Sequence, residues 1–341
     1  MAFKDIIGQK RAVELLKSYI RGKRLHHTYL FVGPKGVGKT LSALNFAKAL
    51  NCLNLSEDKE PCDECQFCKA IDGGYHPDVR LVTTPEEKRE LGIDEIRVLR
   101  QSAYTAPAWG GWKVYIIERA EVLTREAGDA LLKILEEPPQ RCLFILLAPN
   151  VGDVPPTIAS RSHIIRFLPV SKEEIAQFLN RKYGLNEDLA YSLASLSEGR
   201  PGYAITIAEK EDLKKVREDV IQFLLEMPTN PDYFLRAAER FLQIAGEIEE
   251  GEDRDKVQQC LLFASSFFRD LLILQLSGNP SLLINYDKRE TLEGIYRNYN
   301  LEFIHSALNS LQRTYRLLQP GLNFNQQLCL EVMFLDILGG R

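Results

Sequence analysis

Residues 28–41 read Thr-Tyr-Leu-Phe-Val-Gly-Pro-Lys-Gly-Val-Gly-Lys-Thr-Leu, and this stretch decides the fold. An apolar run typical of a buried strand leads into a glycine-rich segment and then a helical pattern, which is the setting of G-x-x-x-x-G-K-[ST]. The glycines let successive N–H groups and a helix N-terminus face an anion. The lysine adds positive charge near the β- and γ-phosphates, and the threonine hydroxyl is a ligand for Mg²⁺. The stretch therefore predicts a site for a nucleoside triphosphate such as ATP with Mg²⁺, formed by Gly33, Pro34, Gly36, Val37, Gly38, Lys39, Thr40 and Leu41.

Length and charge set limits on the rest of the chain. With 341 residues it exceeds one ordinary core, so two or three domains are expected. Its 45% apolar and 26% charged residues are typical of a soluble globular protein. The 43 basic and 47 acidic side chains give a net charge of −4, so any contact with DNA has to come from a local patch.

The N-terminus and the apolar runs argue against a membrane protein. Lys4 and Asp5 stand where a secretory signal would need a long apolar segment. The longest aliphatic run, Leu143–Ala148, is far too short to span a bilayer. We therefore expect a cytoplasmic protein with no membrane partner. Disulfides are rare in the cytoplasm, so clustered cysteines point first to a metal.

Four of the seven cysteines follow the phosphate-loop helix with the spacing C-x9-C-x2-C-x2-C. Each C-x2-C step lets two thiolates point at one ion, and four thiolates complete the closed tetrahedral shell of structural Zn²⁺. Such a shell leaves no open position for catalysis. Free thiols in a loop and an iron–sulfur cluster are the alternatives. The spacing predicts a structural zinc site formed by Cys52, Cys62, Cys65 and Cys68.

A four-cysteine module placed just after the phosphate-loop helix resembles the bacterial clamp-loader family, the AAA+ subunits of the DNA polymerase III holoenzyme. Further stretches are similar to segments of that family along nearly the whole chain. These are His76-Pro77-Asp78, Tyr104–Pro107 followed by Lys113–Ile117, Ala130–Pro139, and Leu322–Asn325. Pro138-Pro139 would stop the third of these segments as a helix.

The resemblance implies a three-part architecture. An α/β AAA+ P-loop domain with a parallel sheet would span residues 1–167, with the zinc module inserted at 52–68. A small helical lid would follow at 168–208. An all-α collar domain, which joins the subunits in this family, would span 209–341. The long amphipathic patterns after residue 211 are consistent with helices in that last part.

Departures from the family pattern favour one kind of subunit. The strand Val114–Ile117 ends in Glu118-Arg119, where the hydrolysing subunits carry two acids. Glu118 can still serve the Mg²⁺ shell, but Arg119 cannot accept a proton from water. Only Asn150 stands where a sensor side chain could reach a phosphate, and Gly202 stands near the position of a second sensor arginine. The combination resembles the delta-prime subunit, with little or no intrinsic ATPase activity.

One catalytic motif of the family is retained. Ala159-Ser160-Arg161-Ser162 resembles its Ser-Arg-Cys motif, whose arginine reaches the ATP of a neighbouring subunit, although an ordinary surface arginine is the alternative. The resemblance implies a hetero-pentamer with gamma/tau and delta subunits that loads the sliding clamp onto primer-template DNA. An ATP-hydrolysing gamma/tau-type subunit is the main alternative function. A P-loop kinase is disfavoured because it would leave the cysteine module unexplained.

Overall fold

The computed structural model describes residues 2–84, 90–227, 233–251, 253–319, 322 and 324–339. Asn323, part of one family-like stretch, lies outside the described residues. The chain divides into two compact units, each described here by itself. The first unit comprises Met1–Glu174 with Gly199–Gly202, and the second comprises Ile175–Glu198 with Tyr203–Arg341.

A five-stranded parallel sheet forms the centre of the first unit. The strand order is β2-β3-β4-β1-β5, with β1 paired to both β4 and β5. Strands β1, β3 and β4 are buried along their whole length, as expected when helices cover both faces of a parallel sheet. The strands span Thr28–Val32 (β1), Val79–Val82 (β2), Lys113–Ile117 (β3), Cys142–Ala148 (β4) and His163–Arg166 (β5).

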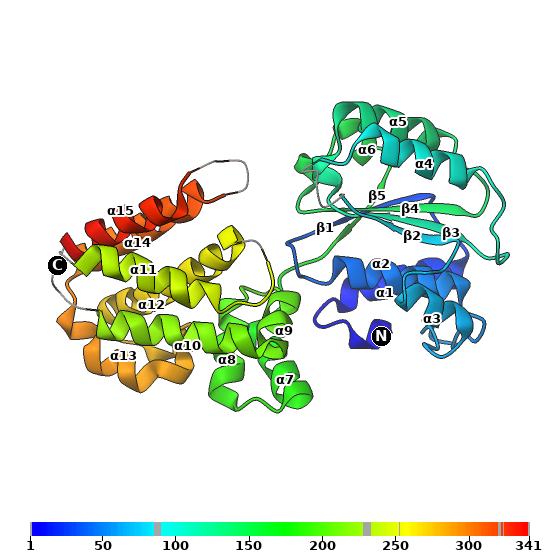
Figure 1. The fold of residues 1–341 in the computed structure, drawn as a ribbon. Coiled ribbons are helices and arrows are strands. Elements are labelled where there is room, and N and C mark those ends of the chain that lie inside the picture. Colours follow the sequence, from blue (N-terminus) through cyan, green and yellow to red (C-terminus); the bar gives the residue numbers. More distant parts are fainter. Residues whose placement is uncertain are drawn as a thin grey trace. The chain divides into compact units, whose positions relative to one another are not determined.

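Helices cover both faces of this sheet (Figure 1). One face carries α4 (Ile93–Ala103), α5 (Arg125–Glu136) and the short α6 (Pro156–Ala159). The other carries α1 (Lys10–Gly22), α2 (Lys39–Asn51) and α3 (Gln66–Asp72). Short 3₁₀ segments complete the unit: η1 (Phe3–Asp5), η2 (Ala120–Val122) and η3 (Val151–Asp153).

Local sequence explains where two of the important helices begin. The hydroxyl of Thr124 caps α5 by accepting a hydrogen bond from the Ala127 amide at 3.2 Å. Helix α2 begins after Gly38, whose φ of 108° lies in the left-handed region that favours glycine. Because parallel strands end at one edge, the loops after β1, β3 and β4 meet there, where α/β sheets bind ligands.

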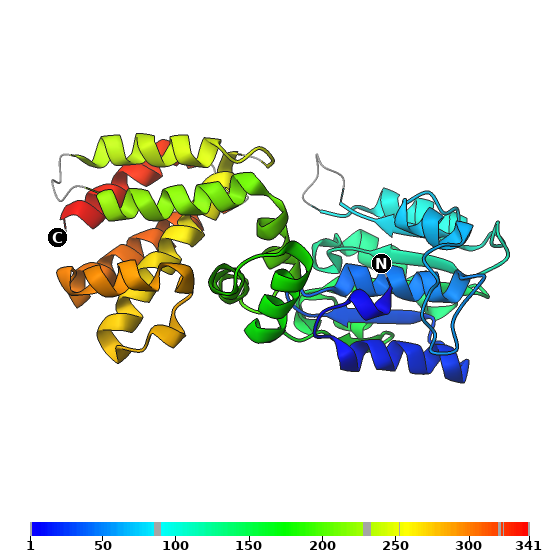
Figure 2. The same cartoon turned by 90° about the horizontal axis from the view of Figure 1, so that it is seen from below.

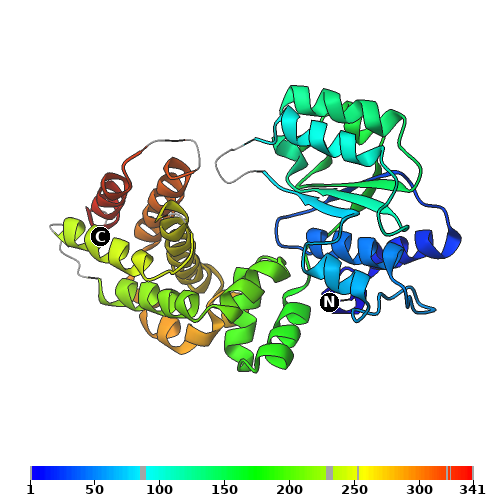
Figure 3. The same ribbon diagram turned by 45° about the vertical axis from the view of Figure 1, so that its right-hand side comes forward.

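In the described residues after β5, all regular secondary structure is helical. In the second unit, α12 packs against α10, α11 and α14, and α15 packs against α11 and α14 (Figures 2 and 3). The bounds are α7 (Lys172–Tyr183), α8 (Glu187–Leu196), α9 (Pro201–Glu209), α10 (Glu211–Glu226), α11 (Phe234–Gly246), α12 (Asp253–Ser277), α13 (Arg289–Ile295), α14 (Leu301–Leu317) and α15 (Gln326–Gly339), with 3₁₀ turns η5 (Pro280–Leu282), η6 (Tyr286–Lys288) and η7 (Tyr296–Asn298).

The core of the second unit is rich in phenylalanine. Phe241, Phe263, Phe267 and Phe303 are each 2% exposed or less. Among the described residues, α12 is the one helix long and apolar enough to cross a bilayer by length and composition. Because 56% of its most apolar window is buried inside the protein, α12 is a core helix of this unit.

The expected fold class is confirmed in its main features: a parallel α/β sheet is followed by a helical C-terminal region. Helix α8 packs against η6, so part of the expected lid belongs to the same compact unit as the C-terminal helices. The boundaries at residues 167 and 208 stay predictions.

Candidate nucleotide and metal sites

The phosphate loop begins with a close backbone approach. The Gly33 amide donates to the Ala148 carbonyl at 3.2 Å, which ties the loop to the end of β4. A Cβ at Gly33 would lie 2.3 Å from the Phe167 carbonyl oxygen, and its φ is 156°. Gly36 and Gly38 have φ values of 82° and 108°. The first glycine is therefore required by space, and the other two by backbone conformation.

The charged end of the loop lies beside the end of β3. Lys39 Nζ donates to the carbonyl oxygens of Pro34, at 2.9 Å, and of Gly33. The Thr40 hydroxyl donates to Glu118 Oε1 at 2.7 Å. Thr40 and Glu118 are the two groups that Mg²⁺ requires in a P-loop site, and the fold brings them into contact across 78 residues. The residues present therefore fit Mg²⁺ with a nucleoside triphosphate.

Burial lowers the pKa of Lys39, and the nearby carboxylates of Glu121 and then Glu118 act against that shift. The direction follows from desolvation, which disfavours the charged ammonium. An anion placed beside Lys39 would therefore stabilise its partly buried ammonium group. The phosphates of a bound nucleoside triphosphate would supply such an anion and act to raise the pKa of Lys39 again.

The structure places the three residues that depart from the family pattern, Arg119, Asn150 and Gly202. Arg119 is exposed and has a left-handed φ of 54°. The Asn150 side-chain amide donates to Asp153 Oδ2 at 3.0 Å, at the start of η3. The Gly202 amide donates to the Gly36 carbonyl at 2.8 Å, so the start of α9 lies against the phosphate loop.

Sequence reasoning missed Glu121, which lies in η2 three residues after Glu118. Its Oε2 atom is shielded from solvent and has no hydrogen-bond partner in the described part of the chain. The charge of Glu121 also acts on Lys39. The acidic pair in Glu118-Arg119-Ala120-Glu121 was the signal available in the sequence, but an acid three residues on does not match the expected acid pair.

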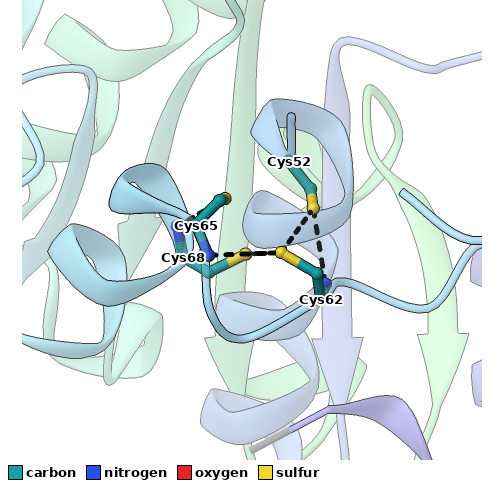
Figure 4. A group of neighbouring side chains, drawn as sticks. All are labelled: Cys52, Cys62, Cys65 and Cys68. Carbon is teal, nitrogen blue, oxygen red and sulfur yellow. Dashed lines mark hydrogen bonds between the residues drawn. The ribbon is translucent and has the colours of Figure 1, made fainter. Parts of the chain in front are cut away.

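The four predicted metal ligands come together in space (Figure 4). Their sulfur atoms all lie within 4.8 Å of one another. Cys52 and Cys62 Sγ are 3.5 Å apart, and Cys62 and Cys68 Sγ are 4.0 Å apart. A tetrahedral zinc with bonds of about 2.3 Å separates its sulfur ligands by about 3.8 Å. The cluster therefore fits a tetrahedral ion of that size.

Backbone amides point at the sulfurs of this cluster. The amides of Cys62, Cys65 and Cys68 donate to the sulfurs of Cys52, Cys62 and Cys65 at 3.3–3.5 Å. Burial tends to raise the pKa of Cys65, but donors from Cys68 and Leu53 and the neighbouring thiols outweigh it and lower the pKa to about 6. Such donors favour the thiolate, which is the form that binds a metal.

A buried lysine links the segment that carries the cysteine cluster to the phosphate-loop helix. Lys48, on α2, has a side chain only 1% exposed. Its ammonium lies 2.7 Å from Asp63, which stands between Cys62 and Cys65, and 2.9 Å from Asp72, which follows the last cysteine of the cluster. Because α2 runs from Lys39 to the cap residue Cys52, one helix joins the phosphate loop to the metal ligands.

Arg161 lies in the turn between α6 and β5. One guanidinium nitrogen is 2.8 Å from Glu136 Oε1 at the end of α5, and another donates to the Thr157 carbonyl at 3.0 Å. Its side chain is 40% exposed. Arg161 precedes β5, whereas the phosphate loop follows the parallel strand β1, so the two lie toward opposite edges of the sheet.

Comparison with known proteins gives consistent results. A family model described as DNA polymerase III, delta subunit, matches residues 8–171, and a model for the C-terminal part of that subunit matches residues 240–338. The tau subunit of DNA polymerase III from Bacillus subtilis is 30% identical over 334 residues, which is 92% of this chain and 58% of the relative. The gamma subunit from Buchnera aphidicola is 37% identical over 177 residues, which is 52% of this chain and 48% of the relative.

A solved gamma subunit-related protein from Thermotoga maritima covers 96% of this chain and 99% of its own length, at 19% identity and a TM-score of 0.47. The chain spans about half the length of the two curated relatives just named. The two family models match both ends of the chain, with the phosphate loop inside the first and the helices α12, α14 and α15 inside the second. The chain belongs to the bacterial AAA+ clamp-loader family of DNA polymerase III.

Proposed function

We propose that this chain is a clamp-loader subunit that holds Mg²⁺-ATP in its own phosphate loop and presents Arg161 to the ATP of a neighbouring subunit. One observation carries the second part of this proposal. Arg161 is exposed at the amino end of β5, toward the edge of the sheet opposite to the chain's own phosphate loop. A finger in that position suits a nucleotide bound by another chain.

The proposed function requires partner subunits. The chain would assemble with gamma/tau and delta subunits in a hetero-pentamer, in the bacterial cytoplasm, and the complex would load the sliding clamp onto primer-template DNA. An apolar stripe on α15, formed by Leu328, Val332 and Leu335, supports an assembly role for the helical unit because each side chain is more than 40% exposed. The cysteine cluster would hold structural Zn²⁺.

Two subunit types remain candidates. Arg119 favours delta-prime, because a cation cannot accept a proton from the attacking water. The Thr40–Glu118 contact and the names of the relatives, tau and gamma, favour an ATP-hydrolysing subunit. ATP turnover by the isolated chain that is abolished by Lys39→Ala would favour the second type.

The test of Arg161 uses the complex reconstituted with gamma/tau and delta subunits. Arg161→Ala should leave assembly and zinc content intact and lower the ATPase activity stimulated by DNA and the clamp. A finger supplied in trans contributes roughly 10³–10⁵ in rate at its own interface. The loss in the whole complex should be partial, because other subunits supply further fingers.

Two variants make the result specific. Arg161→Lys should not restore the rate, because lysine lacks the planar guanidinium fork. Arg125→Ala removes an exposed arginine from the first turn of α5 and should leave the rate unchanged. If the complex with Arg161→Ala hydrolyses ATP and loads clamps at the unmodified rate, the trans-acting role is wrong.

A further inference from the structure

The chain after β3 turns sharply before it reaches α5. Arg119 adopts a left-handed φ of 54°, which is uncommon for a residue with a side chain. The turn leaves the Arg119 side chain exposed and starts the 3₁₀ segment η2, in which the Val122 amide donates to the Arg119 carbonyl at 2.9 Å. Strained backbone of this kind persists where the surroundings hold it, and it gathers at functional sites.

Backbone hydrogen bonds hold the segment that directly follows Glu121. The Leu91 amide donates to the Val122 carbonyl at 2.9 Å, and the Thr124 amide donates to the Leu91 carbonyl at 3.1 Å. These bonds fix η2 beside the carboxyl end of β3, where Glu118 accepts the Thr40 hydroxyl. The position of the Glu121 backbone is therefore set by the same edge of the sheet that carries the nucleotide site.

One oxygen of the Glu121 carboxylate accepts no hydrogen bond from the described residues. This atom, Oε2, is buried. A buried acceptor without a donor is unfavourable, and each such case in a folded protein requires a reason. Glu121 acts on the charge of Lys39 more strongly than Glu118 does, so its carboxylate belongs to the surroundings of the phosphate loop.

We propose that Glu121 is the second carboxylate of the nucleotide site and the base that accepts a proton from the attacking water. The assignment rests on the proposed function, since it requires ATP in this phosphate loop, and it deepens that function by making this chain a hydrolysing subunit. Arg119 then leaves the site intact, because its side chain is exposed to solvent and the acid is supplied two residues later.

The reaction balances with water as the only co-reactant. The water oxygen bonds to the γ-phosphorus while the bond from that phosphorus to the bridging oxygen breaks. ADP leaves with the electron pair, and the proton of the water passes to Glu121 Oε2 and then to the products. Lys39 and the positive end of α2 stabilise the charge that develops on the transferring group. Glu118 and Thr40 hold the metal side of the site.

The experiment measures ATP hydrolysis by the full-length chain, alone and in the complex whose other subunits carry disabled phosphate loops. Glu121→Gln keeps the size of the side chain and removes the base. The hydrolysis rate should fall at least about 100-fold, the usual contribution of a positioned general base. The affinity for Mg²⁺-ATP, measured by titration of a fluorescent analogue, should stay within a few-fold.

Matched variants separate the base from other effects of charge. Glu126→Gln removes an exposed acid from the first turn of α5 and should change nothing. Lys39→Ala should abolish turnover by the unmodified chain, which assigns the activity to this site. Arg119→Ala should retain turnover, because the proposal gives that side chain no part in the reaction.

Two outcomes overturn the assignment: no hydrolysis at the phosphate loop of the unmodified chain, or an unchanged rate with Glu121→Gln. Unchanged turnover with altered stability would identify Glu121 as a structural counter-charge for Lys39. Failure of the proposed function is a different result. A chain that assembles without hydrolysing ATP refutes Glu121 alone, whereas a chain that hydrolyses ATP but does not join the complex refutes the clamp-loader role alone.

Discussion

At the scale of single residues, Cys65 shows how backbone geometry prepares a metal ligand. It is the N-cap of α3, and its sulfur accepts the Cys68 amide. The positive end of a helix and its free amides stabilise a thiolate. The lowered pKa means that the thiolate form of Cys65, which binds a metal, is favoured relative to that of a free cysteine.

Replacing Cys65 by Ser should release the zinc and loosen residues 52–70. A structural zinc site contributes on the order of 10 kcal/mol in small peptides, so the loss should be visible as a lower melting temperature. Cys329→Ser removes a cysteine far from the cluster in sequence and should leave the metal content unchanged. Elemental analysis that finds no stoichiometric zinc in protein purified without chelator would contradict the site.

His163 provides a prediction of pH dependence. Its ring stacks on His26 with centroids 4.3 Å apart, and its Nε2 lies 2.5 Å from the Tyr19 hydroxyl. Burial lowers the pKa of His163, and the neighbouring His26 lowers it further. Between the folded value and the unfolded value of about 6.5, the unfolded state binds more protons. The titration of His163 therefore leaves the free energy of unfolding unchanged above about pH 6.5. It lowers that free energy as the pH falls below that value toward the pKa of the folded state.

We expect the melting temperature to fall between pH 7.5 and pH 5.5, and the fall to be smaller in His163→Gln. His76, whose pKa burial also lowers, should maintain part of the dependence. His305→Gln, on the exposed side of α14, serves as the control and should keep the full dependence. An unchanged slope in His163→Gln would refute the explanation.

At the scale of elements, the start of α9 is fitted to the phosphate loop. The Gly202 amide donates to the Gly36 carbonyl at 2.8 Å, and a Cβ on Gly202 would lie 2.9 Å from the same oxygen. It would also lie 3.2 Å from Gly36 Cα. A side chain, and above all an arginine, cannot enter this backbone contact without moving one of the two segments.

Gly202→Ala should therefore weaken both stability and ATP binding. Alanine favours a helix over glycine by about 1 kcal/mol, but overpacking against fixed backbone costs typically about 1–3 kcal/mol. The matched control is Gly294→Ala in α13, where a new Cβ meets nothing within 4 Å and should be neutral or stabilising. Denaturant unfolding and ATP titration of both variants check the result. Equal unfolding free energies and ATP affinities for the two variants would show that the backbone at Gly202 and Gly36 moves apart at little cost.

At the scale of the whole molecule, a polar network ties distant helices of the second unit together. Arg217 on α10 forms a bidentate salt bridge with Asp287, with N···O distances of 2.6 and 2.9 Å. It also donates a hydrogen bond to Asn285 Oδ1 at 2.8 Å. The backbone amide of Asp287 also donates a hydrogen bond to the hydroxyl oxygen of Ser192 on α8 at 3.0 Å. The network holds a helix of the expected lid to the helices of the expected collar.

Asp287→Asn should destabilise the helical unit by about 3–5 kcal/mol, because it leaves a buried guanidinium without its counter-charge. The side chain of Arg217 is only 4% exposed. Glu218→Gln removes an exposed partner of Lys288 and should cost less than about 1 kcal/mol. Calorimetry should show the transition of the helical unit shifted and that of the nucleotide unit retained. A shift of both together would mean that the two units unfold as one.

The sequence by itself determined the features that contiguous residues carry. The glycines and Lys39 of the phosphate loop, the spacing of the four cysteines and the apolar periodicity of the C-terminal helices are each local, so local rules predict the strand, the loop, the metal ligands and the helices. The parallel sheet also follows, because buried strands alternate with helices.

Only the tertiary structure decided which side chains meet across the sheet and between helices. The pairing of Arg161 with Glu136, the burial of Lys48 between two aspartates and the contact of Gly202 with Gly36 join residues that no local pattern relates. Glu121 is the clearest case, because a single left-handed residue at Arg119 sets where the next acid lies. Sequence spacing gives the order of charges along the chain, but backbone dihedrals and packing decide which of them reach the phosphate loop.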